Sequence, residues 1–176
     1  MKTKRLKTKF AITIFMFLVA FALTPNTVCG QNKTVVSLRE NLFSFQVNRD
    51  DMPEGARYKL FLNKRQIGTI NEPFVDLVNS FDLSAFNQKV VILSVANGGN
   101  ACPQKLVLIS FSKGGLIQDK DVRLILVSPQ FGNCHEDPSF TANSQSVKIN
   151  FPWGKNPVAE SWLYNGSKLI RTKPRR

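Results

Sequence analysis

The chain is poor in the residues from which enzymes build active sites. Its 176 residues include one histidine and three cysteines. A Ser-His-Asp arrangement would have to use His135, and no Gly-x-Ser-x-Gly motif is present to expose a nucleophile. A zinc site needs more Cys or His than this sequence contains. We therefore expect no metal, no cofactor and no chemistry of the nuclease, protease or oxidoreductase kind.

Long apolar runs are also scarce, and the longest one lies near the amino terminus. Residues 10–23 are apolar except for Thr13 and follow a basic segment, residues 1–9. As a helix the run would measure about 21 Å, short of the ~30 Å hydrocarbon core of a membrane. This layout is typical of a secretory signal cleaved near Gly30. Lipid attachment at Cys29 and a retained anchor remain alternatives, although Val28 is an unusual residue before a lipidated cysteine.

Acidic residues are outnumbered, with 24 Lys and Arg against 12 Asp and Glu. Removing residues 1–30, which hold five basic residues, lowers the net charge from +12 to +7. The carboxyl end gathers five cations that could contact a polyanion or, weakly, a membrane surface; they are Lys168, Arg171, Lys173, Arg175 and Arg176. A solvated tail is the ordinary alternative, and we expect no nucleic-acid partner for an exported protein.

What the sequence does contain is a series of short strand patterns separated by turns. Residues 42–47 and 58–62 alternate between apolar and mostly polar positions, whereas residues 89–95 and 105–111 are apolar almost throughout and residues 123–127 are similar. Continuous apolar runs of this length suit strands that are covered on both faces. We expect a single domain over residues 31–176, mainly β, folded as an antiparallel sandwich or barrel with at most one short helix.

Turn residues support the same fold class. Residues 63–66 form a polar turn between two strand patterns, and the Asn165-Gly166 pair predicts a hairpin with a type I′ turn. One segment is ambiguous, because Phe74, Leu77, Val78 and Phe81 have helical spacing. A two-turn helix and an extended segment are equally good predictions there.

Few residues suggest chemistry, and each has a structural alternative. Asp50, Asp51 and Glu54 could supply paired carboxylates for an envelope hydrolase, yet they lie beside turn residues where solvated charge is ordinary. The same holds for Asp119 and Asp121. The run 134–137, Cys-His-Glu-Asp, is best interpreted as a polar turn. Trp153 is either an exposed recognition residue or, as the pattern favours, part of the core.

Two segments around the cysteines resemble a known group of proteins. Residues 98–103 read Gly-Gly-Asn-Ala-Cys-Pro, and residues 128–134 read Ser-Pro-Gln-Phe-Gly-Asn-Cys. With the closing hairpin at 164–170, they resemble a group of small uncharacterised exported proteins of Gram-negative bacteria, over about half of residues 31–176. The resemblance implies a periplasmic location and a Cys102–Cys134 bond, and it implies no activity.

The sequence therefore favours a non-catalytic periplasmic or secreted β-domain that binds a protein or a cell-envelope component. An envelope hydrolase acting through the carboxylates near Asp50 and Glu54 is one alternative. A polyanion or membrane-surface binder acting through the basic carboxyl-terminal tail is the other. The oligomeric state stays open.

We predict a disulfide between Cys102 and Cys134. After removal of the signal they would be the two remaining cysteines, and an isolated pair in an oxidising compartment is more often bonded than redox-active or metal-bound. Two strands and a Gly-Gly turn lie between them, so the chain goes out and returns. Replacing both cysteines with serine should lower the free energy of unfolding by about 2–4 kcal/mol and leave the strand content intact. Two free thiols in a non-reduced digest of the exported protein, measured by mass spectrometry, would refute the bond.

Overall fold

The computed structural model describes residues 33–40, 42–53, 55–98, 105–114, 122–133, 137–153 and 155–172. These residues form twelve strands and one short 3₁₀ turn, η1 (Ser84–Phe86). The strands are β1 (Lys33–Glu40), β2 (Phe43–Met52), β3 (Gly55–Leu62), β4 (Arg65–Ile70), β5 (Phe74–Leu83), β6 (Gln88–Ala96), β7 (Lys105–Ser112), β8 (Leu124–Val127), β9 (Ser139–Ala142), β10 (Val147–Trp153), β11 (Asn156–Tyr164) and β12 (Leu169–Thr172).

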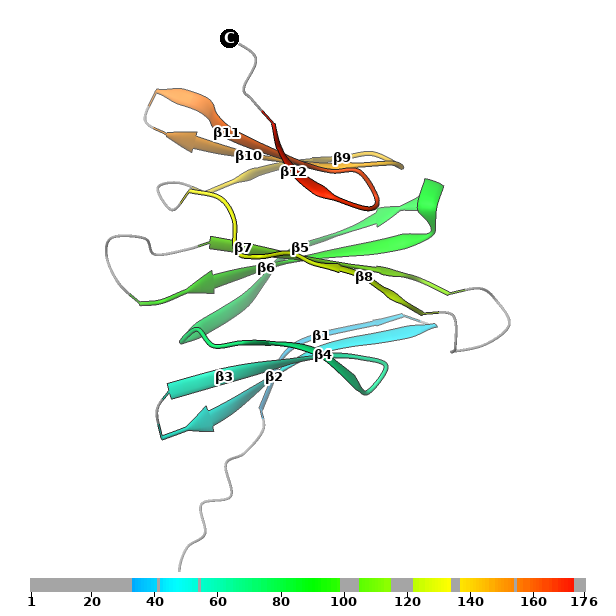
Figure 1. Cartoon of the computed structure of the whole chain (residues 1–176), viewed down its shortest axis with the longest axis vertical. Helices are drawn as coiled ribbons and strands as arrows, with labels where there is room; N and C mark the ends of the chain where they lie inside the picture. Colours follow the sequence, from blue (N-terminus) through cyan, green and yellow to red (C-terminus); the bar gives the residue numbers. More distant parts are fainter. Residues whose placement is uncertain are drawn as a thin grey trace, which may run out of the picture.

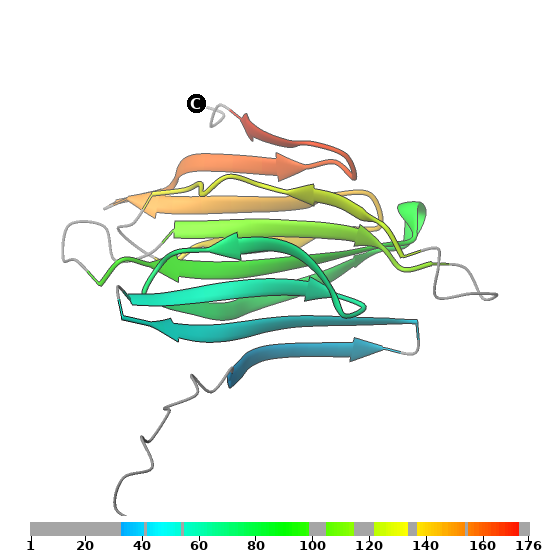
Figure 2. The same cartoon turned by 60° about the horizontal axis from the view of Figure 1, so that its bottom comes forward.

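The strands form three antiparallel sheets that stack as layers (Figure 1). Each sheet is a meander of four consecutive strands: the first sheet is β1–β4, the middle sheet β5–β8 and the last sheet β9–β12. In the second view the strands of all three sheets run in similar directions (Figure 2), as in aligned sheet packing. The predicted fold class is confirmed as a mainly β antiparallel sandwich, and no sheet of the described residues closes into a barrel.

The middle sheet is covered on both faces, which explains its continuous apolar sequence. Along β6, Val91 and Leu93 belong to the core shared with the first sheet. The intervening Val90 and Ile92 belong to the core shared with the last sheet. Strand β7 alternates in the same way. Successive side chains of a strand point to opposite faces, so a strand between two cores needs an apolar residue at every position. The prediction of doubly covered strands is therefore confirmed for β6 and β7. It is wrong for residues 123–127, because β8 lies at the edge of the sheet and its Leu124 and Ile125 are 40% and 37% exposed.

Aromatic residues fill much of the space between the layers. In the first core the rings of Phe43 and Phe45 pack against Phe111, with centroids 4.9 and 6.1 Å away. In the second core Phe131 contacts Phe151 and Trp162 at 6.2 and 5.1 Å. Offset and edge-on contacts of this kind add to the stabilisation from buried area.

A buried polar cluster joins the middle and last sheets. The hydroxyl oxygens of Tyr164 and Ser110 lie 2.6 Å apart, and the Tyr164 hydroxyl also donates to the side-chain oxygen of Gln88 at 3.1 Å. The Gln88 amide in turn donates to the carbonyl of Gly166 at 2.9 Å. Burial raises the pKa of Tyr164, so the hydroxyl keeps its proton. Each buried polar group is thereby satisfied, which avoids the cost of an unpaired one.

The ambiguous segment from Phe74 is a strand, β5, and not a helix. Its pairing with β6 is shifted by a β-bulge between Leu77 and Asn79. The bulge adds one residue and reverses which positions face each core. Val78 and Phe81 therefore both pack against the second core although they are three residues apart. This change of phase within a strand produced the helix-like spacing in the sequence.

The backbone conformations of the hairpin turns at residues 63–64 and 165–168 differ from those expected from their sequences. Asn63 and Lys64 both have positive φ, 47° and 65°, so this polar turn is the one with type I′ geometry. The Asn165-Gly166 prediction is wrong in turn type, because φ is positive at Gly166 and not at Asn165. Gly166 is the only residue of this turn with a positive φ; the Asn165 N–H donates to the Lys168 carbonyl at 3.2 Å, and the Lys168 N–H donates to the Asn165 side-chain oxygen at 3.0 Å.

Gly132 provides a test of the packing between the middle and last sheets. It has a φ of +92°, and a Cβ added there would overlap the ring of Phe151. That ring is 1% exposed and has no room to move. We expect Gly132→Ala to lower the free energy of unfolding by at least about 2 kcal/mol more than Gly55→Ala. Gly55 is the matched control, since its φ is also positive and nothing lies within 4 Å of an added Cβ. Equal losses in urea denaturation would contradict the packing.

Candidate functional site

Asp50 and Asp51, the two described carboxylates that the hydrolase hypothesis would use, do not face each other as a catalytic pair. Asp50 and Asp51 are neighbours on β2 and therefore point to opposite faces of the first sheet. The Asp50 carboxylate accepts an ion pair from Lys59 at 2.8 Å, and Asp51 accepts one from Arg49 at 2.7 Å. Glu54 lies outside the described residues, as do Asp119 and Asp121. Each described carboxylate is thus neutralised by a cation of its own.

The basic carboxyl-terminal tail is described only in part. Lys168 lies in the last hairpin and is exposed, and Arg171 lies on β12. The Arg171 guanidinium is 3.5 Å from the carboxylate of Glu160, which also accepts the indole N–H of Trp162. Lys173, Arg175 and Arg176 lie outside the described residues. Of the two described cations, one is already partnered within the protein.

Several other predicted features fall outside the described residues. These are the signal segment 1–30, the cysteines Cys29, Cys102 and Cys134, and the His135-Glu136 pair. Within the described ranges no group of three His, Cys, Asp or Glu side chains is arranged to hold a metal ion. No helix in that part of the chain is long and apolar enough to span a membrane.

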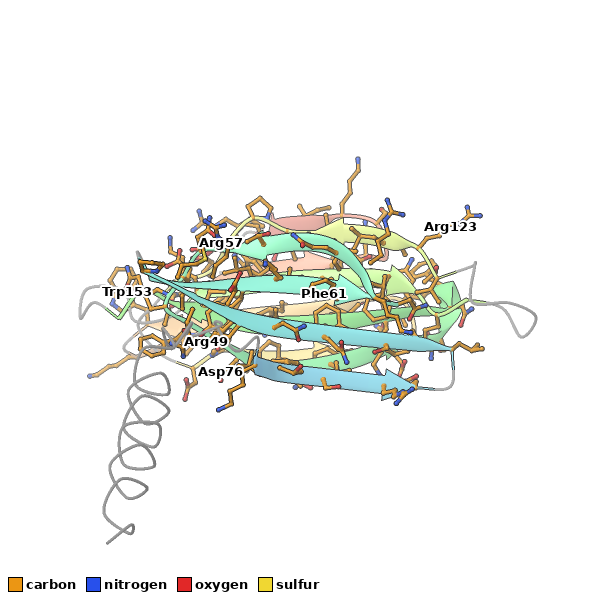
Figure 3. All side chains as sticks on the ribbon, turned by 90° about the horizontal axis from the view of Figure 1, so that it is seen from below. Arg49, Arg57, Phe61, Asp76, Arg123 and Trp153 are labelled. Carbon is orange, nitrogen blue, oxygen red and sulfur yellow. The ribbon has the colours of Figure 1, made fainter. Side chains whose placement is uncertain are left out.

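Trp153 is exposed, so the prediction that it belongs to the core is wrong. It is 61% exposed, whereas Phe151, two residues earlier, is buried. The pairing of β10 with β11 shifts between these two residues, and the bulge turns Trp153 away from the core at the end of the hairpin. In Figure 3, which is seen from below the three layers, it lies at one side of the molecule, where the strands end.

The outer face of the first sheet is an open surface of mostly polar side chains. Tyr58, Leu60 and Leu62 of β3 point into the core, so the alternate residues of β3 point to solvent. The pairing registers extend this alternation to the neighbouring strands. The outer face consists of Thr34, Ser37 and Arg39 on β1, Ser44, Gln46, Asn48 and Asp50 on β2, Arg57, Lys59 and Phe61 on β3, and Gln66 and Thr69 on β4.

An aromatic ring lies between two amides in the middle of this face. Phe61 pairs with Gln46 on one side and with Gln66 on the other. In Figure 3, which looks onto the first sheet, Phe61 lies within the sheet and away from the strand end that carries Arg57 and Arg49. The Gln66 amide donates to the Thr69 hydroxyl at 3.2 Å, which orients it along the face. Gln46 makes no side-chain hydrogen bond to the described part of the chain and is available to a ligand.

The outer face carries three cations and one carboxylate among its described residues. The cations are Arg39, Arg57 and Lys59, and the carboxylate is Asp50. Lys59 is paired with Asp50, while the Arg39 guanidinium has no ion pair within the described ranges. Counted over its described residues, the face therefore has a net charge of +2 around a neutral centre.

An ion-pair cluster lies where the first and middle sheets meet, next to Arg39. The Lys89 ammonium, with its side chain 10% exposed, donates to Glu40 at 2.7 Å and to Asp82 at 3.2 Å. Lys113 donates to the second oxygen of Asp82 at 2.8 Å. An open pocket of about 510 Å³ adjoins the cluster. Its lining residues are Arg39, Glu40, Leu42, Phe43, Asn87, Lys113 and Gly114.

The charges of this cluster shift the pKa values of its members. Burial by itself raises the pKa of Asp82, but the hydrogen bonds and charges of Lys113 and Lys89 outweigh burial and lower it. Burial by itself lowers the pKa of Lys89, but Glu40 and Asp82 outweigh burial and raise it. Both groups are held in their charged forms, so the cluster joins the sheets and does not act as an acid or a base near neutral pH.

The chain matches no protein-family model, no curated protein and no solved structure. The resemblance to exported proteins of Gram-negative bacteria therefore stays a prediction from the residues around the two cysteines. What the described residues of the outer face offer to a ligand is one half-buried aromatic ring, amide groups and positive charge.

The outer face was missed at the sequence level although a signal for it was present. The alternation of residues 58–62 places Phe61 in phase with Lys59, on the side opposite to Leu60 and Leu62. An aromatic residue in the polar phase of a strand points away from the core, and Phe61 is half-buried there among its cross-strand neighbours. That Phe61 lies between two glutamines depends on strand pairing, and residue spacing along the chain does not contain this information.

The ion-pair cluster predicts a pH-dependent effect of Asp82→Asn. The folded-state pKa of Asp82 is below its ordinary value, so its contribution to stability is present above about pH 4 and is lost as the pH falls through the folded pKa. The variant should lose up to about 1 kcal/mol at pH 7, the order expected for half-exposed ion pairs, and progressively less towards pH 3.

Asp76→Asn is the matched control for this measurement. Asp76 lies on the same strand, is exposed and forms no ion pair with the described part of the chain. Its substitution should leave the free energy of unfolding almost unchanged at both pH values. A loss for Asp82→Asn that is the same at pH 3 and pH 7 in urea denaturation would contradict the assignment.

Proposed function

We propose that this protein is an exported, non-catalytic binding domain that attaches to a component of the cell envelope through the outer face of its first sheet. The observation that supports the proposal most directly is the Gln46–Phe61–Gln66 row, an aromatic ring held between two amides on an open surface. Export, to the periplasm or beyond the cell, is inferred from residues 1–30 of the sequence.

The arrangement of charged groups favours binding over hydrolysis. A glycosidase needs two carboxyl groups that face each other across one cleft, about 5–10 Å apart. Asp50 and Asp51 lie on opposite faces of the sheet, and each is ion-paired at less than 3 Å. Neither carboxylate is free to act as a proton donor or a nucleophile in this arrangement.

A sandwich also suits the role of an attachment module. The middle sheet is enclosed, so the two outer sheets provide the broad faces of the molecule, and strands hold their side chains in fixed positions. A ligand that binds such a face meets side chains that are already ordered, which lowers the entropic cost of binding.

The proposal predicts that the outer face is needed for retention on envelopes. The exported protein should co-sediment with isolated Gram-negative cell envelopes, and the triple variant Gln46→Ala, Phe61→Ala, Gln66→Ala should lower its apparent affinity at least about tenfold. Loss of one anchor residue typically costs 1–2 kcal/mol or more, and 1.4 kcal/mol corresponds to tenfold. Circular dichroism of the variant checks that the strands are retained.

Two further variants separate the proposal from its alternatives. Lys148→Ala, Leu163→Ala, Ile170→Ala changes three cross-strand neighbours on the outer face of the last sheet and should leave retention unchanged. Lys173→Gln, Arg175→Gln, Arg176→Gln removes charge from the tail and should also have little effect. Retention that is lost with the tail variant and kept with the Phe61 triple variant would favour the polyanion-binding tail instead.

A further inference from the structure

We infer that the ligand of the outer face of the first sheet is an acidic polysaccharide, an inference that rests on the binding function proposed above. The inference is argued from three observations: the residue types that share the face, their cross-strand pairing and the sign of the surrounding charge. Each of these observations matches a different chemical feature of such a chain: the apolar side of a sugar ring, its hydroxyl groups and its carboxylates.

The central row matches a sugar ring in size and chemistry. Adjacent strands lie about 4.8 Å apart, so the strands carrying Gln46 and Gln66 are each about one ring width from the strand of Phe61. The face of an aromatic ring is electron-rich and attracts the C–H groups on the apolar side of a pyranose. A side-chain amide both donates and accepts hydrogen bonds, which is what the hydroxyl groups at the edges of a sugar require.

The next row extends the site for further sugar units. Asn48, Lys59 and Thr69 pair across the same three strands, two residues along from the central row on β2 and β3. Two residues of a strand advance by about 6.7 Å, so this row continues the polar surface along the strands beyond the central row. Thr34 donates to the Asn48 amide oxygen at 2.9 Å, which leaves the amide N–H groups of Asn48 directed to other partners.

The charge of the face selects the acidic class of glycan. Arg39 lies at one end of the face, one row from the neutral centre, and has no ion pair within the described ranges. Guanidinium groups bind carboxylates through two parallel hydrogen bonds, so Arg39 would hold a uronic acid unit at that end of the face. A neutral glycan would leave the charge of Arg39 unused, and Asp50, the one described carboxylate on the face, is already paired with Lys59.

Other macromolecules fit this surface less well. Single-stranded nucleic acid binds to platforms on which several aromatic side chains stack successive bases, and Phe61 is the one aromatic residue on the described part of this face. The centres of protein interfaces are enriched in large apolar and aromatic anchors, whereas the other eleven side chains of this face are polar or charged.

Titration calorimetry with three small probes tests the inference: tetragalacturonate, the neutral maltotetraose and tetraphosphate. We expect tetragalacturonate to bind at least about tenfold more tightly than either of the others. Phe61→Leu keeps an apolar side chain without the ring and should weaken tetragalacturonate about tenfold, while Phe61→Tyr should restore it. Arg39→Gln should weaken tetragalacturonate and leave maltotetraose unchanged.

Matched controls lie on the opposite side of the molecule. Ile170→Ala and Lys148→Gln remove an apolar and a basic side chain from the outer face of the last sheet and should not change binding. Equal binding of tetraphosphate with no effect of Phe61→Leu would overturn the glycan assignment. Equal binding of maltotetraose would overturn the acidic one. Failure of all three probes while the protein still co-sediments with envelopes through Phe61 would overturn this inference and leave the proposed function standing.

Discussion

The two-sided burial of the middle sheet is the constraint on which the rest of the structure depends. Strands β6 and β7 alternate their side chains between two cores, so each strand stabilises both neighbouring layers at once. Complete burial of a Val, Leu or Ile side chain contributes about 1.5–3 kcal/mol, and nine such side chains of these two strands are buried. Without the middle sheet the two outer sheets would each have an apolar face and nothing to cover it.

This arrangement also decides where the protein can interact with other molecules. Each outer sheet uses one face for a core and leaves the other to solvent, and these two free faces differ in chemistry. The first sheet presents amides, hydroxyls and cations around Phe61, whereas the last sheet presents Leu163 and Ile170 beside Lys148. Polar groups hold the layers in register without using the first of these faces: the Lys89 cluster joins the first two sheets, and the Tyr164–Gln88 cluster joins the last two.

Strand positions were largely predictable from the sequence because the periodicity of two is a local property. The alternation in residues 42–47 placed Phe43, Phe45 and Val47 on one side, and all three lie in the first core. The helix-like spacing of Phe74 and Phe81 misled because a bulge in β5 shifts the phase within one strand. Trp153 was assigned to the wrong environment for the same reason, since the bulge beside it depends on the partner strand.

The sequence by itself determined the β class, the strand segments and the cover that β6 and β7 need on both faces, although the same pattern wrongly predicted such cover for β8. It also contained, in residues 1–30, the signal on which the expectation of export rests. Only the tertiary structure decided that the strands form three layers, that Asp50 and Asp51 are separated, and that Phe61 lies between Gln46 and Gln66. The physical reason is that periodicity records which side of a strand is buried, while neighbours across a sheet depend on strand order and register, which are set by contacts between distant segments.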